Sequence, residues 1–158
     1  MSNRSPQRAP LRACLGSILC LLAAPAVIAA EFPEEDPKPF AEARVILQLS
    51  DRDEDKQNAV LDVACNLIRH YGGPDMIDVE IIAFGHGIDL LIAGNSRSER
   101  IDSLVVSGVR FVACANTVDT LERITGKRPE LNEHAIPVQT GVAHIVERAA
   151  QGFILVRP

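Results

Sequence analysis

Five short apolar runs constrain the fold of this chain more than any other feature. Most of them are solid stretches of aliphatic and β-branched residues, which is typical of strands buried on both faces of a sheet. Longer segments with helical periodicity separate them. Strands and helices that alternate in this way predict a mainly parallel sheet with helices on both sides. The runs cover residues 43–50, 77–85, 109–114, 134–139 and 153–158.

The helix after the first run has the clearest pattern. Acidic residues in "DRDED" precede it and suit the positive end of the helix dipole. Apolar residues from Val60 to Tyr71 then recur on one stripe, and Gly72-Gly73-Pro74 ends it. Further helices are predicted at 87–94, 98–108, 116–126 (capped by Asn116 or Thr117) and 140–152 (capped by Thr140).

These elements predict one α/β domain over residues 43–158, a three-layer, doubly wound sheet of the flavodoxin type. The sheet would have five strands, mainly parallel. Pro137 lacks a backbone N–H and therefore places the fourth strand at an edge or makes it very short. In such sheets ligands bind at the carboxyl ends of the strands.

The first thirty residues have the pattern of a secretory signal peptide. Three arginines precede a run from Cys14 to Ala30 that has no charge, and small residues end it. We expect cleavage after Ala29 or Ala30 and a periplasmic or secreted product, the alternative being a retained membrane anchor. Residues 31–42 are rich in acids and prolines and predict a flexible arm.

Charge then excludes two classes of partner. Removing the three arginines of the signal from 16 Lys+Arg leaves 13 against 21 Asp+Glu, a net charge near −8. A chain this acidic is not expected to bind nucleic acid, or a membrane once the signal is cleaved.

Two cysteines remain after cleavage, Cys65 and Cys114. Cys114 ends the third run and directly precedes a predicted helix, whose free N–H groups would lower the pKa of its thiol. The alternative is a small core residue. Cys65 is expected on the flank or the solvent side of its helix, facing away from the sheet, so we do not expect a disulfide between the two.

The sequence "GHG" follows the second run and would lie at the same edge of the sheet. Gly85 and Gly87 permit a tight turn or the close approach of a ligand, and His86 could move a proton beside Cys114. The alternative is a turn with a solvated histidine. The glycines lack the spacing of a dinucleotide fingerprint.

No cofactor or metal site is predicted. The four histidines show no pair at a ligand spacing, and no C-x-x-C is present. His144 is expected on the surface of the last helix. The loop after the first strand, "SDRDEDK", is acidic and would repel the phosphate of a flavin.

Four segments together resemble the DsrE/DsrF-like family: "RVILQLSD", "VEIIAFGHGIDLL", "SGVRFVACANT" and "GVAHIVERAAQGFILVRP". The resemblance covers residues 43–158. It implies a flavodoxin-like fold, homo-oligomers such as trimers or hexamers, and sulfur relay through a persulfide on a cysteine that falls on Cys114. The sulfur-relay members act in the cytoplasm, whereas this chain begins with an export signal.

Two functions follow as expectations. The first is an exported sulfur carrier, at most a sulfurtransferase-like protein, with Cys114 as the sulfur site, His86 assisting, and Gly85, Gly87, Asn116 and Thr117 around the ligand. Its donor and acceptor proteins stay unidentified. The second is a homo-oligomeric module that binds a small ligand without covalent chemistry. The apolar stretches "LLIAG" and "SLVV" are compatible with either an oligomer surface or core packing.

Overall fold

The computed structural model describes residues 38–158. The predicted signal peptide and residues 31–37 of the predicted arm lie outside this part of the chain. Within residues 38–158, no helix has the length and apolar character needed to cross a membrane.

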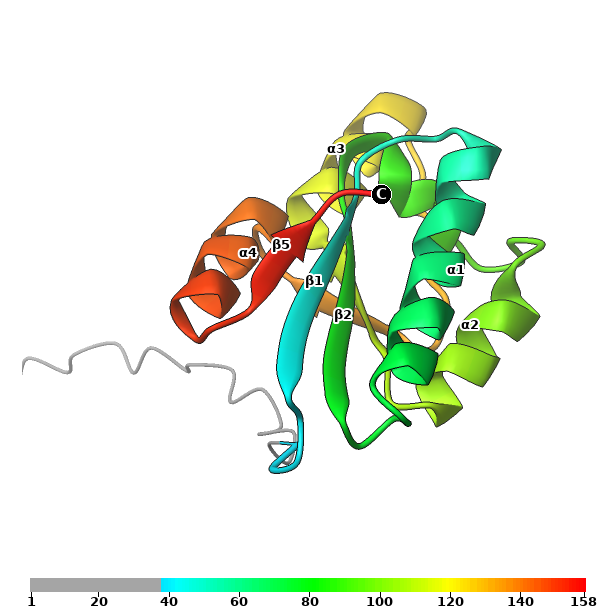
Figure 1. Ribbon diagram of the computed structural model, residues 1–158. Coiled ribbons are helices and arrows are strands. Elements are labelled where there is room, and N and C mark those ends of the chain that lie inside the picture. The colour runs from blue at the N-terminus through cyan, green and yellow to red at the C-terminus, as the bar shows by residue number, and fades with distance from the viewer. Residues whose placement is uncertain (1–37) are drawn as a thin grey trace, which may run out of the picture. The chain divides into compact units, whose positions relative to one another are not determined.

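A single sheet of five parallel strands forms the centre of the domain, as predicted (Figure 1). The strand order is β4-β3-β2-β1-β5. The fourth strand is short, contains Pro137 and lies at an edge, which confirms the expectation from that proline. The strands are β1 (Ala43–Leu49), β2 (Ile77–Ala83), β3 (Arg110–Cys114), β4 (Ala135–Val138) and β5 (Ile154–Val156).

Helices connect the strands and cover both faces of the sheet, which is consistent with a flavodoxin-like three-layer fold. Figure 1 shows α1 and α2 on one side of the sheet and α4 on the other. The predicted helix at 87–94 is a 3-10 helix that begins earlier, at Gly85. The helical elements are α1 (Glu54–His70), η1 (Gly85–Leu91), α2 (Ser98–Val106), α3 (Ala115–Thr125) and α4 (Gly141–Ala150).

The cap of α1 follows the acidic pattern, but the caps of two other helices do not. Asp53 accepts hydrogen bonds from the first turn of α1. The prediction that Asn116 or Thr117 caps the third helix is wrong, because α3 begins at Ala115 with Cys114 in the cap position. Thr140 does occupy the cap position of α4, but its side chain makes no capping hydrogen bond. Both of these helix starts therefore keep backbone N–H groups for other partners.

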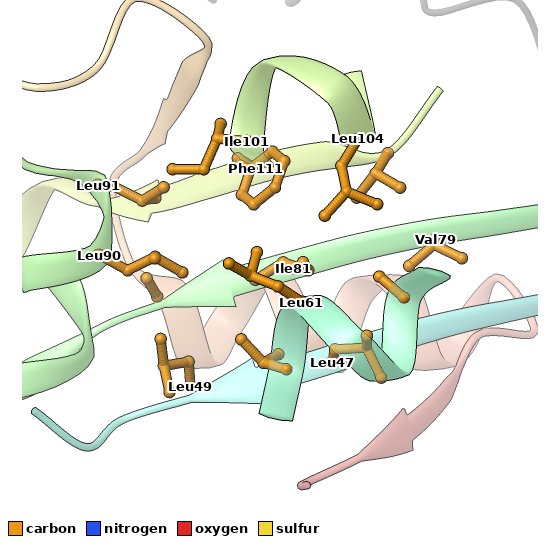
Figure 2. Packing of buried hydrophobic residues seen from close by; sticks show 14 of the residues in the cluster. Leu47, Leu49, Leu61, Val79, Ile81, Leu90, Leu91, Ile101, Leu104 and Phe111 are labelled. Carbon is orange, nitrogen blue, oxygen red and sulfur yellow. The ribbon is translucent and has the colours of Figure 1, made fainter. Parts of the chain in front are cut away.

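One face of the sheet carries the main hydrophobic core. We call it the α1 face, because α1, η1, α2 and α3 all pack against it. Figure 2 shows Leu47, Ile81 and Phe111 of the strands meeting Leu61 of α1 and Leu104 of α2. Each buried side chain of this size stabilises the fold by about 1.5–3 kcal/mol, so this face supplies most of the hydrophobic stability.

The opposite face, the α4 face, has a smaller apolar cluster. The only large apolar side chain that α4 buries there is Ile145. The remaining buried members are Ile46, Ile82, Val112, Val138 and Phe153.

The apolar stretches considered for an oligomer surface mostly belong to the core. Leu90 and Leu91 are fully buried, and Leu104 is nearly so, because all three pack on the α1 face. Exposed apolar side chains gather instead on α4 and on the edge strand β5. Those on α4 and β5 are Val142, Val146, Ile154, Leu155 and Val156, while Val106 of "SLVV", Phe40 and Ile124 are exposed elsewhere.

The last residues of the predicted arm are ordered against the amino-terminal edge of the sheet. Lys38 Nζ donates to the backbone carbonyls of Pro74, Ile77 and Gly108, at 2.9, 3.2 and 3.0 Å. Pro74 and Gly108 lie in the loops that enter β2 and β3, and Ile77 is the first residue of β2. The ammonium group therefore ties residue 38 to the domain, at the edge of the sheet opposite to Cys114.

Candidate functional site

The site lies where two neighbouring strands send their helices to opposite faces of the sheet. After β3 the chain turns to the α1 face, where Val118 of α3 joins the main core. After β4 it turns to the α4 face, where Ile145 is buried. β3 and β4 are paired, so the crevice between their two connections is the topological switch point at which open parallel sheets bind ligands. Cys114 ends β3, and Gly141 begins α4.

The Cys114 thiol lies between the starts of two helices. Its sulfur is 3.3 Å from the backbone nitrogen of Gly141, the first residue of α4, and this N–H donates to it. Thr117 and Asn116, in the first turn of α3, lie on the other side of the sulfur and also favour its thiolate form. Only 6% of Cys114 is exposed. The cysteine is thus both enclosed and surrounded by donors.

These donors decide the acidity of the thiol. Burial raises the pKa of Cys114, since it disfavours the charged thiolate. The hydrogen bonds from Gly141, Thr117 and Asn116 favour the thiolate and outweigh burial, so the pKa lies below that of an ordinary cysteine. A thiolate is the nucleophilic form of cysteine, and the site therefore favours a reactive sulfur.

Gly141 can approach the thiol because it has no side chain. A Cβ atom at this position would lie 3.2 Å from Cβ of Cys114 and 3.5 Å from Cβ of Phe84. The first contact is tighter than ordinary van der Waals packing. A larger residue would push α4 away from the sulfur and lengthen the hydrogen bond to it.

Asn116 joins the two connections at the switch point. Its backbone N–H donates to the Gln139 carbonyl, and its amide oxygen accepts from Gln139 Nε2 at 2.7 Å. Its amide nitrogen donates to Thr140 Oγ1 at 3.0 Å. The start of α3 is therefore held to the residues that lead into α4. Its side chain has a structural role at this edge.

Thr117 links the thiol to the glycine-containing turn. Gly85 N–H donates to Thr117 Oγ1 at 3.1 Å. Because the threonine oxygen accepts there, its own proton is free to point toward the Cys114 sulfur, in agreement with the lowered pKa. Gly85 adopts a positive φ of 55°, a conformation that favours glycine.

His86 and Gly87 do not contact the Cys114 thiol and have separate roles. The His86 ring is exposed, and its Nδ1 lies 3.3 Å from a guanidinium nitrogen of Arg52, which also pairs with Asp89. Gly87 packs on the first strand, where a Cβ would come within 2.3 Å of the Leu49 carbonyl oxygen. The structure thus brings Gly85, Asn116 and Thr117 to the Cys114 site, places His86 beside Arg52, and gives Gly87 a packing role.

A buried cluster of charges lies beneath α4 on the same face of the sheet. Its centre is Glu80 of β2, which is fully buried. His144 Nε2 lies 2.8 Å from one carboxylate oxygen, while Arg110 and Arg148 each approach the other to 2.8 Å. Arg110 also pairs with Asp78 at 2.8 Å. The expectation that His144 lies on the surface is wrong, because its ring faces Glu80 under the helix.

Glu80 is ionised under most conditions. Burial raises its pKa, but the hydrogen bond from His144 and the charges of Arg110 and Arg148 lower it to about 2. A signal for this cluster is present in the sequence of β2. Asp78 and Glu80 are two residues apart in a strand expected to be buried on both faces, so both had to face one side and needed cationic partners.

Cys65 lies on the other side of the sheet from Cys114. It packs at the rim of the main core on the α1 face and borders a shallow pocket with Ile68, Leu104 and Ser107. Both cysteines are free thiols. Within residues 38–158, no cluster of histidine, cysteine and carboxylate side chains is arranged to hold a metal ion.

Comparison with known proteins finds structural similarity to a solved protein. No protein-family model and no curated protein match the chain. A solved structure of a protein of unknown function, MTH1491 from Methanobacterium thermoautotrophicum, is similar with a TM-score of 0.65 and 29% identity. The match covers 74% of this chain and all of that one. The same fold therefore extends over the whole of that chain.

Proposed function

We propose that this protein is an exported sulfur carrier that holds sulfane sulfur as a persulfide on Cys114. The observation that carries the proposal is the Cys114 sulfur at the switch point, where the Gly141 N–H donates a hydrogen bond to it and the first turn of α3 also favours the thiolate. A thiolate stabilised in this way is both a nucleophile toward sulfur and a leaving group when sulfur is passed on.

The transfer balances without an added oxidant or reductant. The Cys114 thiolate attacks the terminal sulfur of a polysulfide dianion. One S–S bond forms, the neighbouring S–S bond of the donor breaks, and its electron pair leaves with the shortened polysulfide. An acceptor thiolate then attacks the outer sulfur of the Cys114 persulfide, and the electron pair of the broken bond returns to Cys114. No proton needs to move in either step. The transfer therefore does not require His86 as a proton donor or acceptor.

The enclosure of Cys114 favours a small sulfur donor. With 6% of the residue exposed, a terminal sulfur on a narrow chain reaches the thiolate more easily than a persulfide fixed on a protein surface. Inorganic polysulfide and low-molecular-weight persulfides fit this condition. The N–H groups at the two helix starts also favour an anion.

Export and self-association belong to the same proposal. The signal-like segment 1–30 would take the chain to the periplasm or outside the cell. Exposed apolar residues on α4 and β5, together with the unpaired edge of β5, support a homo-oligomer.

Reaction with polysulfide tests the proposal directly. The reduced protein, Cys114→Ser and Cys65→Ser are treated with polysulfide, and the mass of each cysteine peptide is measured. We expect a gain of one sulfur, about 32 Da, on the Cys114 peptide of the wild type and of Cys65→Ser. An absence of gain in folded wild type would overturn the proposal.

A second candidate is a homo-oligomeric module that binds a small ligand without covalent chemistry. The low exposure of Cys114 favours it, since buried cysteines often only fill space. Reactivity separates the two functions. A carrier thiol reacts with iodoacetamide in the native state near neutral pH, whereas a packed thiol reacts only after unfolding.

A further inference from the structure

We propose that Glu80 is a positioning residue for Cys114, and that it acts by holding α4 on the sheet so that Gly141 N–H points at the sulfur. The chemical use of this arrangement rests on the proposed function. The arrangement itself can be tested without sulfur transfer.

Helix α4 has little apolar attachment of its own. Gly141 and Ile145 are its only buried residues, so one large apolar side chain fixes it to the sheet. By comparison, α1 buries Val60, Leu61 and Ala64. Val142 and Val146 of α4 point away from the sheet and are exposed. Contacts other than hydrophobic packing must therefore set the position of α4.

Glu80 supplies those contacts. Its carboxylate binds His144 Nε2 through one oxygen and an Arg148 guanidinium nitrogen through the other, both at 2.8 Å. The two residues are four apart, so they lie on one side of the helix. A single buried carboxylate thus holds two successive turns of α4.

Glu80 is itself fixed to the sheet. Arg110 of the neighbouring strand binds it through two guanidinium nitrogens at 2.8 and 3.0 Å, and pairs with Asp78 as well. The carboxylate belongs to a central strand. Because Glu80 is fixed in the sheet, it also fixes the position of α4 relative to the sheet.

The position of α4 affects the acidity of the Cys114 thiol through Gly141. Gly141 lies one turn before His144, and its N–H donates to the Cys114 sulfur over 3.3 Å. A displacement of α4 by about 1 Å would weaken this bond, because hydrogen bonds depend steeply on distance and angle. The sulfur would then keep its burial but lose a donor.

The test measures the acidity of Cys114 in folded variants. The rate at which iodoacetamide alkylates Cys114 is followed by the mass of its peptide between about pH 5 and 10. The variants are Glu80→Gln, His144→Ala and His144→Gln, in the full chain. The control is Asp62→Asn, which breaks a 2.6 Å ion pair between α1 and Arg100 of α2 on the opposite face. Circular dichroism verifies folding.

We expect Glu80→Gln and His144→Ala to raise the pKa of Cys114 by about one unit, a loss of about tenfold in thiolate at pH values below the pKa. His144→Gln retains a donor toward Glu80 and should restore most of the acidity. Asp62→Asn should leave it unchanged. An unchanged pKa in folded His144→Ala would overturn the proposal, and this variant decides the matter if Glu80→Gln does not fold. If these shifts occur but polysulfide adds no sulfur, only the proposed function fails.

Discussion

The two faces of the sheet are stabilised in different ways. On the α1 face, three α-helices and η1 press aliphatic and aromatic side chains against all three central strands. On the α4 face, one helix of ten residues covers a small apolar cluster and a set of buried charges. Non-directional hydrophobic contacts dominate the first face, whereas directional ion pairs dominate the second.

Because of this difference, the stability of the fold and the reactivity of the Cys114 thiol depend on opposite faces of the sheet. Hydrophobic burial contributes energy but tolerates small shifts in position, while a buried ion pair is directional and favours one geometry. The Cys114 sulfur is on the side of the sheet where geometry is fixed by charge. We therefore expect changes on the α1 face to affect unfolding, and changes on the α4 face to affect the thiol.

The largest expected effect is on stability and comes from the α1 face. Leu61→Ala removes a fully buried side chain of the main core and should lower the free energy of unfolding by about 3–5 kcal/mol. Denaturant titration measures the loss. The pKa of Cys114 should stay the same, since Leu61 packs on the other side of the sheet. A shift in that pKa with Leu61→Ala would mean that the two faces are coupled.

Acid should weaken the α4 face through Glu80. Its pKa is about 2 in the folded protein, below the 4.5 of an ordinary glutamate. The stabilisation is therefore present above pH 4.5 and disappears as pH falls toward 2. The difference corresponds to stability on the order of 3 kcal/mol. Denaturant titrations at several pH values should show a weaker acid dependence for Glu80→Gln than for the wild type. Equal slopes would contradict the ion-pair account.

Gly141→Ala should alter the thiol more than the fold. The added methyl group meets Cβ of Cys114 at 3.2 Å and displaces the start of α4. We expect the pKa of Cys114 to rise and its alkylation near neutral pH to slow by about three- to tenfold, with a loss of stability of about 1 kcal/mol. Ala149→Gly, at an exposed position of the same helix, is the control for helix propensity. If it slows alkylation equally, the steric explanation is wrong.

The smallest change in monomer stability is expected for Val146→Asp. This side chain is 64% exposed on α4, so the substitution should cost less than about 0.5 kcal/mol. If α4 and β5 form the proposed oligomer surface, the mass measured by light scattering should fall to that of a single chain. Glu147→Gln, at the next exposed position, should leave the mass unchanged. An unchanged mass in an oligomeric Val146→Asp would place the interface elsewhere.

The order and type of the elements could be predicted from the sequence because apolar periodicity is a local property. The strands, the long helix α1 and the edge position of the strand with Pro137 all followed from it. The helix starts at the site were harder to predict. Asn116 and Thr140 are residue types that cap helices, yet here they bind each other across two connections.

Two features of the site depend on the strand order and could not be predicted from local sequence patterns. The strand order brings Gly141 to Cys114, although 26 residues separate them, and it turns His144 toward Glu80. From sequence alone, His144 between apolar neighbours could equally face solvent. Only the placement of α4 on the face with Glu80 distinguishes the two orientations.

The strand order also has a consequence for the sequence of events during folding. The elements from β1 to α3 supply nearly all of the α1 face before α4 and β5 emerge from the ribosome. Domains can acquire structure progressively from their amino-terminal side. The last elements to arrive are the ones that bring Gly141 N–H to the sulfur. A newly made chain would therefore lack the Gly141 hydrogen bond to Cys114, and with it part of the acidity of the thiol, until its carboxyl-terminal end has docked.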